Sequence, residues 1–100
     1  MNKIDVRWNE MEESLDRVRD LINAIGIKLE FIGECVDHPL LEEIQVKYAV
    51  LRKKHEALCN LVANRDSASE PCTSHLAEFR EIKETVASIR KALTELEKYI

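Results

Sequence analysis

The sequence predicts an all-α protein, an up-down-up antiparallel bundle of three helices with coiled-coil-like heptad packing. Its apolar residues recur at alternating steps of three and four, a spacing that puts them on one face of a helix. Only two Gly and two Pro interrupt the 100 residues. Pro39 and the polar segment at residues 64–71, which ends in Pro71, divide the chain into three helical segments. Because short connections force neighbouring helices to run antiparallel, we expect one helical-bundle domain over residues 1–100.

The first helix is expected over residues 3–36. Its apolar residues keep a 3.5-residue period for more than four heptads, with Trp8 placed at heptad position a. The a and d positions are Ile4, Trp8, Met11, Leu15, Val18, Ile22, Ile25, Leu29, Ile32 and Val36. Gly26 and Gly33 fall at successive e positions, and a glycine inside a helix costs about 1 kcal/mol relative to alanine. We interpret both as sites where a neighbouring helix approaches closely, the alternative being a kink or an early end near Gly26.

The second helix is expected over residues 39–64. Pro39 disfavours helical geometry at His38 but suits the first turn of a new helix, so the first helix should stop before it. The a and d positions are Leu41, Ile44, Tyr48, Leu51, His55, Leu58 and Val62. His55 is the one polar residue in this series. We interpret it as a group that fixes the pairing register of the helices, with a pH-sensitive contact as the alternative.

The third helix is expected over residues 72–100, after a polar loop at residues 64–71. Its a and d positions are Phe79, Ile82, Val86, Ile89, Leu93, Leu96 and Ile100. Further apolar residues occupy e and g positions of the three helices: Leu21, Leu40, Cys59, Leu61 and Leu76. They predict the wider apolar stripe that a closed bundle requires.

Composition disfavours several classes of function. Lys and Arg number 15 against 19 Asp and Glu, a formal charge of −4 that disfavours nucleic acid as a partner. Three cysteines at scattered spacings, with no CxxC and no N-terminal signal sequence, predict a reducing, cytoplasmic location. No apolar run approaches the ~20 residues of a membrane span.

The sequence motifs for metal binding and for catalysis are weak. His55, Cys59, Cys72 and His75 form H-x3-C-x12-C-x2-H, which resembles an inverted zinc-finger pattern. A helical hairpin would separate His55 from Cys72 by about 15 Å along its axis, so we expect neither a metal nor any other cofactor. A Cys59–His55 nucleophile pair would lack oxyanion donors, and there is no phosphate loop, HExxH or GxSxG. We therefore expect no enzyme activity.

Charged and polar surface features are interpreted as ordinary. Arg52, Lys53 and Lys54 form a basic cluster that we take as a solvated helix face, the alternative being an acidic partner or an anionic lipid headgroup. Ser67, in an acidic loop, is a weak candidate for phosphorylation.

Two apolar strips lie outside the heptad core. Ala24, Ile27 and Phe31 occupy positions c, f and c of the first helix, and Val46 with Val50 makes a weaker strip on the second. Apolar residues on a face that should be solvated predict a partner-binding surface. The alternative is that the first helix rotates after Gly26 and buries Phe31.

Short runs of the sequence resemble spectrin repeats, elongated three-helix bundles that scaffold the cytoskeleton. The runs are Arg7-Trp8-x-x-Met11, Arg17, Arg19, Ile22, Phe31 and Lys53-Lys54-His55-Glu56-Ala57-Leu58. The resemblance implies a protein–protein interaction and scaffolding module, an adaptor with a cytoskeletal or assembly component as partner and with self-association left open. Lys53-Lys54-His55 and Ile82-Lys83-Glu84-Thr85 also resemble the N-terminal domain of syntaxins, and Val86, Ile89 and Leu93 the last helix of BAG domains. These imply the alternative, a regulatory domain that binds a SNARE, a chaperone or another folded partner.

Overall fold

Three α-helices make up the computed structural model, which describes residues 3–65 and 71–100 with side chains from residue 7 onward. Helix α1 spans Lys3–Cys35, α2 spans Pro39–Ala63 and α3 spans Thr73–Glu97. The described residues contain no strand, which confirms the all-α prediction. The predicted bounds agree to within a residue except at the end of α3, where residues 98–99 form a turn and the predicted helical end at residue 100 is wrong.

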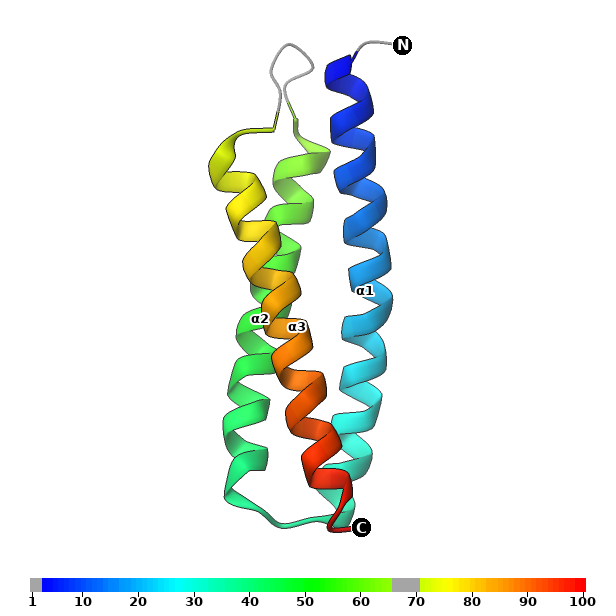
Figure 1. Ribbon diagram of the computed structural model, residues 1–100, viewed down its shortest axis with the longest axis vertical. Helices are drawn as coiled ribbons and strands as arrows, with labels where there is room; N and C mark the ends of the chain where they lie inside the picture. Colours follow the sequence, from blue (N-terminus) through cyan, green and yellow to red (C-terminus); the bar gives the residue numbers. More distant parts are fainter. Residues whose placement is uncertain (1–2, 66–70) are drawn as a thin grey trace.

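The helices lie side by side in an elongated molecule of 51 × 19 × 17 Å, and each packs against the other two. Figure 1 shows α1 running down, α2 returning up and α3 running down again. Ion pairs between helices show which ends lie side by side: Arg65 with Glu12, Lys28 with Glu97 and Lys54 with Glu81. The start of α1 therefore lies beside the end of α2, and its second half beside the end of α3.

The core follows the predicted a and d positions. Its buried apolar residues are Trp8, Met11, Leu15, Val18, Ile22, Ile25, Leu29, Ile32, Ile44, Leu51, Leu58, Val62, Ile82, Val86, Ile89, Leu93 and Leu96. Val36, Tyr48 and Phe79 are half-buried at the edge of this cluster. Ile100 is exposed, because α3 ends before it, and Leu41 is only partly buried. The side chain of Ile4 lies outside the described residues.

The prediction that e and g residues widen the core is wrong for three of the five. Leu21, Leu61 and Leu76 are exposed, while Leu40 and Cys59 pack partly against the core. A bundle only 17–19 Å across is filled by its a and d side chains, since packed helix axes lie about 8–10 Å apart. Apolar area at the flanks is therefore left on the surface.

The break between α1 and α2 follows the predicted signals. Nδ1 of His38, the residue before Pro39, accepts a hydrogen bond from the backbone N–H of Leu40 at 3.0 Å. This side-chain cap satisfies one of the N–H groups that a helix start leaves without a partner. The predicted loop at 64–71 is described only at its two ends, and Ser67 lies outside the described residues.

Glycine allows a close approach at one of the two predicted positions. A Cβ added at Gly26 would overlap Oη of Tyr48 in α2 and lie 3.1 Å from its Cζ, so the Tyr48 side chain would have to shift to admit it. At Gly33 the nearest atom would be Cδ2 of Leu41 at 3.7 Å, an ordinary contact, and the prediction of close approach is wrong. Helix α1 continues through Gly26, which rules out an early end there.

Gly26→Ala should stabilise the protein fully only when the Tyr48 ring is absent. In a Tyr48→Ala background we expect Gly26→Ala to raise the free energy of unfolding by about 1 kcal/mol, the difference in helix propensity. With Tyr48 present the gain should shrink or reverse, because the phenol ring must move. Urea unfolding of the double-mutant cycle measures this coupling. An equal effect of Gly26→Ala in both backgrounds would show that the two residues do not contact.

None of the helices in the described part of the chain is both long and apolar enough to span a bilayer.

Candidate partner-binding surface

The predicted strip on α1 is on the surface of the molecule. Ile27 is 72% exposed and Phe31 is 57% exposed, and Ala24 is exposed as well. Their neighbours Ile25, Leu29 and Ile32 are buried, so α1 keeps one face toward the core through its second half. The alternative in which α1 rotates after Gly26 and buries Phe31 is therefore wrong.

The weaker strip on α2 is exposed too, but it lies elsewhere on the bundle. Val46 and Val50 line a shallow hollow with α3 residues that include Glu84 and Thr85. Ala24 lines a different hollow, together with Arg90 and Thr94 of α3. The two strips thus adjoin α3 from opposite sides, and the structure does not bring them together in one hollow.

Contacts on each side of α1 show which neighbour it faces there. Position e faces α2, because Gly26 lies against Tyr48. Position g faces α3, because Nζ of Lys28 lies 2.5 Å from Oε1 of Glu97. Position c is next to g around a helix, so Ala24 and Phe31 lie on the α3 side of α1.

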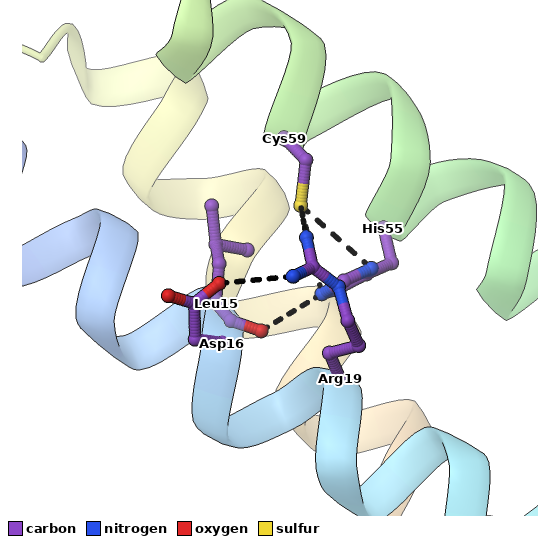
Figure 2. A network of polar contacts seen from close by, with 5 residues as sticks. All are labelled: Leu15, Asp16, Arg19, His55 and Cys59. Carbon is purple, nitrogen blue, oxygen red and sulfur yellow. Dashed lines mark hydrogen bonds and ion pairs between the residues drawn. The ribbon is translucent and has the colours of Figure 1, made fainter.

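A polar network joins α1 to α2 within the otherwise apolar bundle (Figure 2). His55 is 7% exposed, and its Nε2 lies 2.9 Å from the carbonyl oxygen of Leu15. A carbonyl can only accept, so Nε2 carries the hydrogen and donates it. Sγ of Cys59 lies 3.7 Å from Nε2 and 3.8 Å from Nδ1 of the same ring.

Arg19 extends this network to the surface. Its Nη2 donates to Sγ of Cys59 at 3.6 Å, and its Nη1 lies 3.1 Å from Oδ1 of Asp16. These contacts connect positions 40 residues apart in the sequence, and they involve both helices. A buried polar group that is satisfied by one specific backbone carbonyl suits the predicted role of His55 in fixing register.

The residues of the zinc-like pattern do not assemble into one site. His55 and Cys59 belong to the network between α1 and α2, whereas the ring of His75 lies 6.1 Å from that of Trp8. Sγ of Cys72 lies 3.0 Å from the hydroxyl of Ser74, which lowers the pKa of the Cys72 thiol, helped by the backbone at His75. No group of three or more His, Cys, Asp or Glu side chains in residues 3–65 and 71–100 could hold a metal ion.

The basic cluster on α2 makes contacts within the bundle. Nζ of Lys54 lies 2.5 Å from Oε1 of Glu81, and the guanidinium of Arg52 lies 5.9 Å from the centroid of the Tyr48 ring. These contacts favour the interpretation of the cluster as an ordinary solvated face.

No family model, curated protein or solved structure matches the chain. The runs similar to spectrin repeats, syntaxins and BAG domains therefore stay local resemblances.

Sequence reasoning missed the residues of α3 that adjoin the α1 strip, above all Arg90. Arg90 occupies position e of α3, the side that also carries Glu97 and faces α1. A heptad assignment places a residue around its own helix, but it does not say which neighbour lies on the e side. The contact between Lys28 and Glu97 supplies that information.

Proposed function

We propose that this protein is a non-catalytic protein–protein interaction or scaffolding module, with its partner on the outer face of α1. The observation that carries the proposal is the exposure of Ile27 and Phe31 on a helix whose core positions are already buried. Large apolar side chains grouped on one exposed face are typical of partner surfaces. Ala24 belongs to the same surface, and Val46 with Val50 forms a second, weaker one.

We extend this proposal to the packing of the helices and to the location of the protein in the cell. We take the bundle to be antiparallel with coiled-coil-like heptad packing, which the alternating three- and four-residue spacing of its buried residues supports. We place it in the cytoplasm, where free thiols persist, because Cys35, Cys59 and Cys72 are all free. A cytoskeletal or assembly component is the partner class suggested by the resemblance to spectrin repeats.

Phe31→Glu should abolish capture of the partner while the fold persists. A carboxylate placed in an apolar contact must give up its hydration without a matching charge, so binding should fall below detection. The measurement is affinity capture from cell extract with the immobilised chain, read by mass spectrometry, with helicity and melting temperature followed by circular dichroism.

Lys53→Glu is the matched control, because it also adds a carboxylate to an exposed helix position but lies outside the strip. It should capture the same proteins as the wild-type chain. Capture that survives Phe31→Glu would remove the α1 strip from the interface. Cytoskeletal or assembly subunits among the captured proteins would favour scaffolding, and a chaperone or SNARE would favour the regulatory alternative.

A further inference from the structure

Apolar hollows follow the groove between α1 and α3 at two levels. The upper one, about 330 Å³, is lined by Met11, Leu76 and Phe79 among others. The lower one, about 200 Å³, is lined by Leu21, Ala24 and Leu93 among others. From Met11 to Ala24 the groove runs about 20 Å along α1, at 1.5 Å per residue. Leu21 and Leu76, which the core leaves exposed, therefore face this groove.

Basic side chains surround the groove, although the whole chain carries a net charge of −4. Arg90 and Lys28 line the lower hollow. Lys83 lies beside Phe79, with its Nζ 5.5 Å from the centroid of the ring. Arg17 lies beside the upper hollow, where its Nη2 donates to the hydroxyl of Ser14 at 3.1 Å.

Most of this positive charge is not neutralised within the bundle. Arg80 shares a hollow with Phe79 and Lys83. Arg80 and Arg90 make no ion pair within residues 3–65 and 71–100, and among these residues Arg17 contacts only the Ser14 hydroxyl. Three acidic residues of the described chain lie at the groove: Glu10 in the upper hollow, Glu97, which pairs with Lys28, and Glu84, which shares a hollow with Phe79 and Lys83. The acidic residues Glu78 and Glu81 of α3 lie on its other side, where Glu81 pairs with Lys54 of α2.

We propose that the groove between α1 and α3 binds an acidic amphipathic helix of a partner protein, which packs as a fourth helix of the bundle. The inference rests on the proposed function and names the chemistry of the partner. The apolar ridge of that helix would fill the two hollows, and its flanking carboxylates would face Arg17, Lys83 and Arg90. Ala24 is small enough to let a helix approach closely, and Phe31, one heptad further along, lies on the same side of α1.

The recessed shape favours a helix over a membrane as occupant. Leu93 at the lower hollow is fully buried and Met11 at the upper one nearly so. An interfacial membrane-binding face has to present its apolar side chains outward, into the lipid. A helix, by contrast, inserts its side chains between those of two neighbours.

The test uses two fluorescein-labelled synthetic peptides of equal length with the same leucine face, flanked by glutamate in one and by lysine in the other. Fluorescence anisotropy with the full chain should show the glutamate peptide binding at least about tenfold more tightly, with the advantage shrinking as salt is raised. In the Arg17→Glu/Arg90→Glu variant the preference should reverse toward the lysine peptide. Arg52→Glu/Lys53→Glu makes the same change in net charge away from the groove and should keep the original preference.

Ala24→Trp fills the lower hollow without altering charge and should weaken binding of the glutamate peptide at least about tenfold, since a blocked hollow cannot accept the apolar ridge. Circular dichroism verifies that each variant is folded. Equal affinity for both peptides, or a preference unchanged in Arg17→Glu/Arg90→Glu, would overturn the proposal. Binding to phosphatidylserine vesicles in place of the peptide would assign the groove to a membrane, and a dimer that Arg17→Glu/Arg90→Glu dissociates would assign it to a second copy of the chain.

Failure of the acidic-helix proposal can be distinguished from failure of the proposed interaction function. A partner whose capture from extract depends on Phe31 but not on Arg17 and Arg90 would leave the interaction module standing and remove the acidic helix. Capture that does not depend on Phe31 would remove the α1 surface itself.

Discussion

Ile32→Ala is expected to lower the free energy of unfolding by about 2–5 kcal/mol, the range for removing a large aliphatic side chain from a packed core. Ile32 is 0% exposed and lies in the core cluster near the end of α1. The cost has two parts, namely the apolar area that stays in water and the cavity that the neighbouring side chains fill only in part. Urea unfolding monitored by circular dichroism measures it.

The preceding residue provides the matched control for this prediction. Phe31 is the larger side chain, but its exposure means that Phe31→Ala should cost less than about 1 kcal/mol. The order of the two effects tests the rotation of α1 about its own axis. A larger loss for Phe31→Ala than for Ile32→Ala would place Phe31 in the core and remove it from the proposed surface.

Substitutions of His55 should separate space filling from hydrogen bonding. His55→Ala leaves a cavity and removes the hydrogen bond to Leu15, so we expect a loss of about 2–4 kcal/mol in unfolding free energy. His55→Leu fills the space and gives up one hydrogen bond, while the Leu15 carbonyl keeps its helical N–H partner. The loss for His55→Leu should therefore stay within about 1 kcal/mol.

The register role of His55 predicts a further result for His55→Leu. His55 is the one buried polar residue among the side chains of residues 7–65 and 71–100, and without it the bundle loses a constraint on how the helices pair. Sedimentation velocity should then show associated species that the wild-type chain does not form at the same concentration. A single species identical to that of the wild-type chain would show that His55 contributes packing only.

The helices and most of the core were predictable because heptad spacing is a local property of the sequence. Steps of three and four residues identify the side of α1 that bears Trp8 and Ile32, and Pro39 identifies a helix start. Helix ends are less strongly encoded, which is why Ile100 was wrongly assigned to the core. It lies beyond Glu97, where no glycine or proline marks the end of α3.

The surface was predictable only in part, because a heptad pattern does not specify the neighbour on each side of a helix. Phe31 and Ile27 stand out in the sequence as apolar residues at c and f. Arg90 does not stand out, because a charged residue at position e is common and its place beside the α1 strip depends on that side of α3 facing α1 rather than α2. Leu21 and Leu76 were assigned to the core because apolar residues at g and e suit a wide stripe, whereas this narrow bundle is filled without them.

Site-specific photo-crosslinking from position 31 tests most directly whether α1 carries the partner surface. Benzoylphenylalanine replaces Phe31 in one variant and Lys53 in the other, both exposed helix positions. After irradiation in cell extract, the probe at position 31 should give a discrete crosslinked protein that the probe at position 53 does not give. Crosslinks of equal yield from both positions, or from position 53 alone, would contradict a partner surface on α1.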